Sequence, residues 1–191
     1  MSKLATVLDT AVTFFKHAIV WMITGLIVLS SGAWSSESAL QVAFVYNFIK
    51  FIDWPDEAAN SSLRLCVLSA NKDMHEALDQ LNGKSANKHV IELVYLNVET
   101  LLSSPVESCQ MIYRPTRSSV ITLPQPLPKG VVLVINEQEP RDMSASIILI
   151  RNNEGRIEFE INQAAVAQAG IKISSQLLKL AKNSQAGKGQ L

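Results

Sequence analysis

Apolar residues in Leu40–Ile52 (LQVAFVYNFIKFI) recur at the three- and four-residue spacing that is typical of an α-helix. Placed at 100° intervals, they cover an arc of roughly 200°, wider than the apolar stripe of an ordinary surface helix. We expect most of this helix to be buried within its own chain, with coverage by another chain as the alternative. Proline disfavours helical geometry at the residue before it, so Trp54-Pro55 is expected to end the helix. The narrow polar side consists of Tyr46, Asn47, Lys50 and Asp53.

Short apolar runs bounded by turn-forming residues predict the first strands of a sheet. A helix is expected from Asp73 to Leu81, ending at Asn82-Gly83, and a turn of helix over Thr100–Ser104. This alternation of strands with helical segments favours an α/β fold with parallel strand pairs. The three strands are Leu63–Leu68, Val90–Leu96 and Cys109–Tyr113.

The C-terminal half adds three more strands after a proline-punctuated connection at Pro124–Lys129. Val131–Ile135 is apolar throughout, which indicates an interior strand covered on both faces. Ile147–Ile150 and Ile157–Ile161 flank a turn sequence and predict an antiparallel hairpin. Its second arm alternates apolar residues with Glu158 and Glu160, so we expect these two carboxylates on a solvated face. Together the pattern predicts a single compact α/β domain with a mixed, mostly parallel sheet of five to six strands flanked by helices, in a Rossmann-like three-layer arrangement.

Two short helices are expected to close the domain. Asn162 is expected to cap the helix Gln163–Ala169, and Gly170 to close it in the left-handed conformation. Ser174 or Ser175 caps a last helix that runs to Leu180 or Ala181. Its expected core contacts are Leu177, Leu178 and Leu180, and residues 183–191 are expected to form a flexible tail.

The balance of charges excludes one class of protein, and the N-terminal sequence predicts export. The 191 residues carry 17 basic and 17 acidic side chains, which excludes a polybasic nucleic-acid binder. Lys3, Lys16 and His17 precede the 13-residue apolar run Ala18–Ser30, and small residues follow up to Ala33. This layout predicts a secretory signal peptide over residues 1–33 that is cleaved on export. The alternative is an uncleaved anchor, but a membrane span takes roughly 20 apolar residues.

The chain has two cysteines, Cys66 and Cys109, and both lie after the predicted signal peptide. An oxidising compartment allows them to form a disulfide, and two separate buried thiols are the alternative. A bridge over this loop would stabilise the fold by about 4 kcal/mol in the chain-entropy estimate. The pair is not spaced as a Cys-x-x-Cys motif, so neither a redox-enzyme motif nor a zinc knuckle is indicated.

Candidate catalytic groups are few. His75 and His89 lie in polar segments and are expected at the surface. Glu158 and Glu160 share one face of a strand, but a solvated strand face explains them better than acid/base chemistry. No nucleophile, metal-ligand or phosphate-binding motif is present, so no residue is assigned to catalysis and no metal or cofactor site is expected.

Two stretches, Ala43–Pro55 and Gly155–Ala181, resemble the YfiR-like family of small periplasmic proteins. The first matches the family's early helix, Phe-x-Tyr-Asn-Phe-x-Lys-Phe-x-x-Trp-Pro. The second matches its C-terminal Phe-x-Ile-Asn, Ala-rich helix, Gly and Ile-Ser-Ser-x-Leu-Leu-x-Leu-Ala. The matching positions are Phe44, Tyr46, Asn47, Phe48, Lys50, Phe51, Trp54, Pro55, Phe159, Ile161, Asn162, Gly170, Ile173, Ser174, Ser175, Leu177, Leu178, Leu180 and Ala181.

The resemblance implies a periplasmic regulator, not an enzyme, with a YfiR-like domain over residues 34–182. The family's namesake represses an inner-membrane diguanylate cyclase by binding its periplasmic region, which lowers cyclic di-GMP, and the resemblance implies the same role for this chain. An outer-membrane lipoprotein is a further implied partner, and a homodimer is expected. Cys66 and Cys109 match the family's bridge between the first and third strand regions; the family's namesake carries a second pair, so switching through a second disulfide is not expected here.

The exposed part of the first helix is the candidate partner or dimer surface, and its residues are Tyr46, Asn47, Lys50 and Trp54. An alternative of another class is a periplasmic module that binds a small ligand. Open α/β sheets offer crevices at the carboxyl ends of their strands. In that case the loop Ser69–Asp73, after the first strand, would line the pocket.

Overall fold

The computed structural model describes residues 37–54, 62–68, 70–97, 106–115, 121–136 and 142–182, all within the compact unit Ser36–Leu191. The expected signal peptide at residues 1–33, the helical turn at 100–104 and the tail at 183–191 fall outside the described residues. None of the described helices has the length and apolar character that a membrane span requires.

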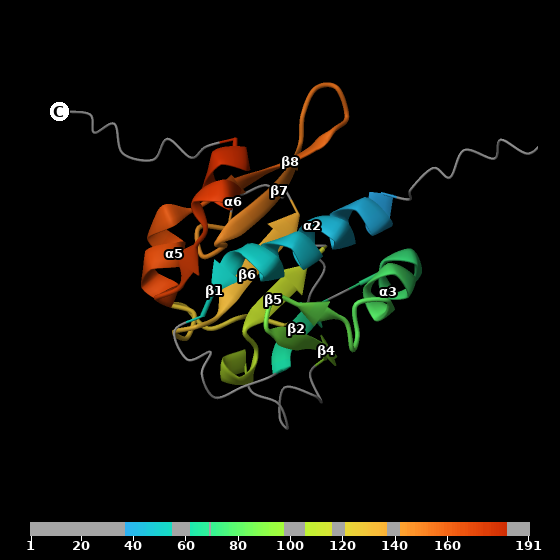
Figure 1. The fold of residues 1–191 in the computed structure, drawn as a ribbon, viewed down its shortest axis with the longest axis horizontal. Helices are drawn as coiled ribbons and strands as arrows, with labels where there is room; N and C mark the ends of the chain where they lie inside the picture. Colours follow the sequence, from blue (N-terminus) through green and yellow to red (C-terminus); the bar gives the residue numbers. More distant parts are fainter. Residues whose placement is uncertain are drawn as a thin grey trace, which may run out of the picture. The chain divides into compact units, whose positions relative to one another are not determined.

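A seven-stranded mixed sheet forms the centre of the fold (Figure 1). The order is β3-β4-β2-β5-β6-β7-β8, in which the five inner strands run parallel and the two edge strands run antiparallel to their neighbours. The strands are β2 (Ser62–Leu68), β3 (Ser85–Ala86), β4 (His89–Leu96), β5 (Met111–Arg114), β6 (Val132–Asn136), β7 (Ile147–Arg151) and β8 (Ile157–Ile161).

The predicted α/β class with a mixed, mostly parallel sheet is therefore confirmed, with one strand more than expected. The additional strand is the two-residue β3, which pairs with β4 across a tight turn where Asn87 has a φ of 55°. Two residues are too few to show an alternating pattern, so the sequence carries no strand signal there. The predicted antiparallel hairpin of β7 and β8 is present, with Leu149 opposite Phe159.

The four α-helices of the described residues lie on one face of the sheet, where α2 crosses in front of it, α3 lies toward β4, and α5 and α6 lie toward β8 (Figure 1). A two-stranded sheet of β1 (Ile52–Asp53) and β9 (Lys172–Ile173) joins the end of α2 to the segment between α5 and α6. The helices are α2 (Glu37–Phe51), α3 (Lys72–Asp79), α5 (Gln163–Ala169) and α6 (Ser175–Leu180), with the 3₁₀-helix η1 (Val106–Ser108).

Each face of the sheet has its own apolar core. On the helical face, Val45, Phe48 and Ile49 of α2 are fully buried, which confirms that most of this helix packs within its own chain. On the other face, η1 and the segment 121–131 cover Ile112, Leu133 and Ile148. Because both faces are covered, the inner strands are apolar on both sides, as the sequence of β6 predicts.

Two expectations about polar residues are wrong. Glu160 was expected on a solvated face, but it is 9% exposed. It lies opposite Ile148, on the sheet face that carries the second core, whereas Glu158 on the same face is only half-buried. His89 was expected at the surface, but it begins β4 and is 6% exposed.

Leu180 was expected in the core and is 71% exposed. The reason is that α6 ends at Leu180, and Ala181 turns inward in its place. The next residue fixes this turn, because the backbone N–H of Lys182 donates to the Phe159 carbonyl at 2.9 Å. Leu177 is buried as expected, and Leu178 packs against the core from a half-buried position.

Candidate interaction surface and strand-end crevice

Three of the four predicted surface residues lie on the outer side of α2. The Tyr46 hydroxyl donates to the Ser85 carbonyl at 2.9 Å, so this half-buried side chain ties the helix to β3. The ammonium nitrogen of Lys50 lies 5.5 Å from the centre of the Tyr46 ring, within the range of a cation–π contact. Asn47 and Lys50 are exposed, so both are available to a partner.

Trp54, the fourth predicted residue, is not on that surface. Its side chain is 7% exposed and belongs to the core, and its indole N–H donates to the Gln110 carbonyl at 3.2 Å. The chain leaves α2 after Phe51 and becomes extended in β1, where alternate residues face the same way, so Ile52 and Trp54 both point inward. Its expected exposure is therefore wrong, and its direct role is to hold the end of α2.

The two family-like stretches meet in the fold. The Phe159 ring lies 5.1 Å from the Phe48 ring and 6.0 Å from the Phe44 ring, centre to centre, both in edge-on geometry. The backbone N–H of Ser174 donates to the Phe51 carbonyl at 2.9 Å, next to the β1–β9 pairing. Contacts of α2 with residues more than one hundred positions later in the chain thus fix the orientation of the helix and of its outer side.

The predicted helix caps are present. The Asn162 side chain accepts from the Ala165 N–H at 3.3 Å, and Gly170 ends α5 with a φ of 70°. Ser174, rather than Ser175, caps α6 by accepting from the Leu177 N–H at 3.2 Å. Ser175 is the first residue of the helix.

Cys66 and Cys109 form a disulfide, with their Cα atoms 5.8 Å apart. The bridge joins β2 to the residue that follows η1, and both cysteines are fully buried in the second core. It therefore holds the segment before β5 against the sheet face opposite the helices.

A crevice opens where β2, β5 and β6 end. From β2 the chain passes to β4, which lies on one side of β2, and then returns to β5, which lies on the other side. The connections that follow β2 and β5 therefore lead away from each other at this point of the sheet. Divergence of this kind marks the usual ligand crevice of open α/β sheets. Two adjoining hollows of about 300 and 240 Å³ share Glu37, Gln41 and Asn136. Of the predicted pocket loop, Asn71 contributes to the lining, together with Met74, whereas Ser69 lies outside the described residues.

The floor of the crevice is a hydrogen-bonded cluster. The Gln41 side-chain oxygen accepts from the Asn136 amide at 3.1 Å. The Tyr113 hydroxyl lies 3.1 Å from the Asn136 oxygen and 3.4 Å from that of Gln41. Burial raises the pKa of Tyr113 well above its usual value, with the nearby Glu37 carboxylate adding to the rise. This phenol therefore stays protonated and serves as a donor.

Two ion pairs lie at the ends of strands β7 and β5, and the first of them lines the crevice. Glu37, in the first turn of α2, pairs with Arg151 at the end of β7. Arg114, at the end of β5, binds Asp142 at 2.6 Å, and both side chains are largely buried. Burial acts to raise the pKa of Asp142, but hydrogen bonds from Ser144 and Arg114 outweigh it and lower that pKa below its usual value.

Little in the sequence indicates this cluster. Gln41 is a polar interruption in an apolar helix, a pattern that often marks a satisfied buried polar group. Tyr113 lies within an apolar strand and Asn136 ends one, and neither belongs to a motif. Within the described ranges, no group of three or more histidine, cysteine or acidic side chains is arranged to hold a metal ion.

The family model described as YfiR/HmsC-like matches residues 38–182, which include α2 except its first residue, the whole seven-stranded sheet and α6.

Proposed function

The chain belongs to the YfiR/HmsC-like family, and we propose that it represses an inner-membrane diguanylate cyclase by binding the periplasmic region of that enzyme. This family regulates cyclic di-GMP signalling in the periplasm and is regulatory, not catalytic. The observation that carries the proposal is the extent of the match, which takes in both family-like stretches and the contacts between them.

Repression by binding is a shift between two conformations of the cyclase. To move an equilibrium from 1:99 to 99:1, the repressor must bind the inactive conformation more tightly by about 5.5 kcal/mol. Binding of this strength usually depends on a few aromatic, apolar and charged anchors. On α2, Tyr46, Asn47 and Lys50 are accessible to serve as such contacts, and Trp54 holds the helix end beneath them.

A cellular and a biochemical experiment test the proposal together. Deletion of the gene should raise cyclic di-GMP, and expression of the exported protein should restore the lower level. The tagged protein should retain a diguanylate cyclase from solubilised inner membranes, under oxidising and reducing conditions compared side by side. An unchanged cyclic di-GMP level, with no cyclase retained, would refute the proposal.

Three further features follow from the same proposal. The first 33 residues act as a signal peptide that is removed on export, the protein forms a homodimer, and an outer-membrane lipoprotein sequesters it from the cyclase. Mass spectrometry of the periplasmic protein tests the first, because the mature chain should begin near Trp34. Light scattering tests the second, and co-purification with outer-membrane lipoproteins tests the third.

The strand-end crevice supports a second candidate function, a module that binds a small ligand without a cyclase partner. Gln41, Asn71 and Asn136 supply amide groups to a hollow of about 300 Å³ at the point where strand connections diverge. A metabolite that raises the melting temperature, while no cyclase sensor domain does so, would favour this function. Stabilisation by the sensor domain alone would favour the repressor.

A further inference from the structure

The outer side of α2 carries an apolar stripe that the core covers only in part. Leu40, Phe44 and Phe51 lie within about 40° of one another around the helix, at 100° per residue. Leu40 is 43% exposed, and the two phenylalanines are half-buried. With the exposed Ala43 beside them, these four residues form the α2 stripe, which the exposed side chain of Asn47 interrupts between Phe44 and Phe51. It extends over about 17 Å, or three helical turns.

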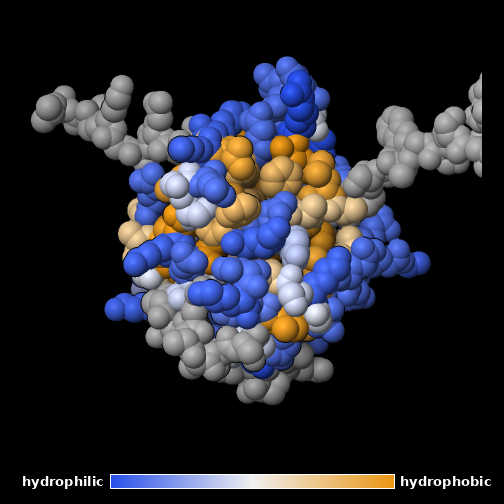
Figure 2. Space-filling view, viewed as in Figure 1, coloured by the Kyte–Doolittle hydropathy of each residue, from blue (hydrophilic) through white to orange (hydrophobic). Residues whose placement is uncertain are grey.

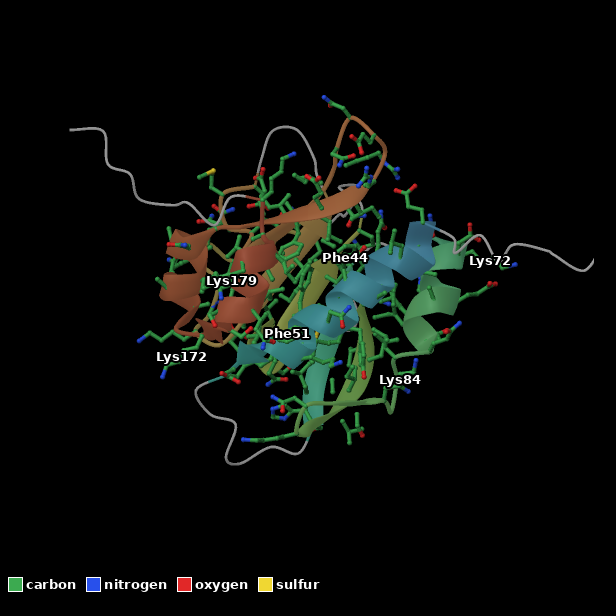
Figure 3. All side chains as sticks on the ribbon, turned by 45° about the horizontal axis from the view of Figure 1, so that its top comes forward. Phe44, Phe51, Lys72, Lys84, Lys172 and Lys179 are labelled. Atoms are coloured by element: carbon green, nitrogen blue, oxygen red, sulfur yellow. A yellow bond between two sulfur atoms is a disulfide. The ribbon has the colours of Figure 1, made fainter. Side chains whose placement is uncertain are left out.

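Lysines border the α2 stripe on both sides. Lys172 and Lys179 lie on the α6 side, and Lys84 lies on the β3 side, with Phe44 and Phe51 between them (Figure 3). Lys50 is on α2 itself. We call these four residues the lysine rim. They take part in none of the ion pairs found among the described residues, whose basic partners are Arg64, Lys72, Arg114, Arg151, Arg156 and Lys182.

Among the described residues, acidic side chains are few beside the rim. The sequences of β9 and α6 contain lysines and no acidic residue, and Asp53 lies opposite Lys172 in the small sheet. Figure 2 shows this face with apolar side chains gathered toward the N-terminal half of α2 and hydrophilic ones around them. The pattern is an apolar track within a basic border.

We propose that the α2 stripe and the lysine rim bind an amphipathic helix of another protein, whose apolar side chains fill the stripe and whose carboxylates meet the rim. Apolar residues at positions i, i+3, i+4 and i+7 would follow the stripe, as in other helix-in-groove complexes. The inference rests on the proposed function only in assigning that helix to the regulated membrane protein.

Charge argues against a second copy of this chain as the occupant. A twofold interface places the same patch of both subunits face to face, so the lysine rim would oppose itself. Like charges brought together in this way disfavour association. An acidic partner has the complementary charge.

The shape of the stripe argues against a lipid surface. The Phe44 ring is half-buried and packs 6.1 Å from Phe48 and 6.0 Å from Phe159, so it lies against the core. Membrane-binding faces insert their apolar side chains several ångströms into the lipid. Rings held against the core in this way instead receive side chains that project from a partner.

Two synthetic helical peptides test the proposal on the exported protein. Both carry leucine at positions i, i+3, i+4 and i+7; one has glutamate on the flanking positions and the other has lysine. Fluorescence anisotropy should show that the glutamate peptide binds at least about tenfold more tightly, with a preference that shrinks as salt is added. Equal binding of the two peptides would overturn the proposal.

Charge reversal locates the site. The double variant Lys50→Glu, Lys179→Glu should weaken binding of the glutamate peptide about tenfold and strengthen binding of the lysine peptide. Lys72→Glu is the matched control, because this exposed lysine lies on α3, away from the rim (Figure 3), and its reversal should leave both affinities unchanged. Ala43→Glu should abolish binding of both peptides, since it places a charge in the stripe at an exposed position.

Other occupants give distinct results. Binding to phosphatidylglycerol vesicles but to neither peptide would overturn the proposal in favour of a membrane surface. Self-association that is lost in Ala43→Glu would overturn it in favour of a second copy. If the cyclase is retained equally by the wild type and the double variant, the docking site is wrong and the proposed function stands. If the peptides behave as expected and cyclic di-GMP does not respond to the protein, the docking site stands and the proposed function is wrong.

Discussion

The ring of Phe48 on α2 packs against the ring of Phe159 on β8 at 5.1 Å between centres, although 111 positions separate the two residues in the chain. Phe48 is fully buried and Phe159 is 5% exposed. This contact anchors the N-terminal helix to the edge of the sheet and presents the outer side of α2 in a fixed orientation.

We predict that Phe48→Ala destabilises the fold by about 3 to 5 kcal/mol, because it leaves a cavity between α2 and β8. Chemical unfolding followed by circular dichroism measures the change. The neighbouring substitution Asn47→Ala is the control, since that exposed side chain should alter the free energy of unfolding by less than about 0.5 kcal/mol. A loss of similar size in both variants would contradict the packing.

We predict that a substitution of Trp54 lowers the free energy of unfolding, whereas a substitution of Lys50 weakens partner binding only. Trp54→Phe keeps an aromatic side chain but leaves the Gln110 carbonyl without the indole donor, so we expect a loss of about 1 to 3 kcal/mol in unfolding experiments. Lys50→Ala should leave stability unchanged and weaken retention of the partner in a pull-down. A Trp54→Phe protein as stable as the wild type would show that the indole hydrogen bond contributes nothing.

Removal of the disulfide should destabilise the protein without loss of the sheet. Cys66 and Cys109 are 43 positions apart, and closing such a loop is worth about 4 kcal/mol in the chain-entropy estimate. We expect Cys66→Ala, Cys109→Ala to lower the free energy of unfolding by roughly 2 to 5 kcal/mol. Reduction of the wild type should give the same unfolding curve as the double variant, and a reductant should not affect the double variant.

Stability should depend on the ionisation of Asp142. Its pKa is lower in the folded protein than in the unfolded chain, so its contribution is fully present above the ordinary carboxyl pKa of 3.8 and is lost as the pH falls through the folded value. The difference in unfolding free energy between the wild type and Asp142→Asn should therefore be large at pH 7 and smaller near pH 3. A difference that is constant across this range would contradict the assignment.

Gly170 is predicted to tolerate asparagine better than alanine. Its φ is 70°, a conformation that costs other residues roughly 1 to 2 kcal/mol and that asparagine adopts more readily than alanine. A Cβ at this position meets no atom within 4 Å, so backbone strain alone should set the cost. Thermal unfolding should rank the glycine protein first, then Gly170→Asn, then Gly170→Ala.

Local chemistry made some of these features predictable. The spacing of apolar residues predicted α2, because a helix buries the side chains of one face. Short apolar runs predicted the inner strands, because both faces of these strands are buried. Asn162, Gly170 and Ser174 were predictable as caps because their contacts reach only a few residues along the chain. The fold class and the hairpin followed from the same local patterns.

Tertiary structure decided the features that depend on distant residues. Glu160 is buried because a second core covers its face of the sheet, and Trp54 is buried because β1 pairs with β9. Gln41 and Asn136 meet at the crevice only because α2 crosses the carboxyl end of β6, 95 positions later. A pattern along the chain records which residues avoid water, but the partners that cover them, and the polar groups brought together beside them, come from packing alone.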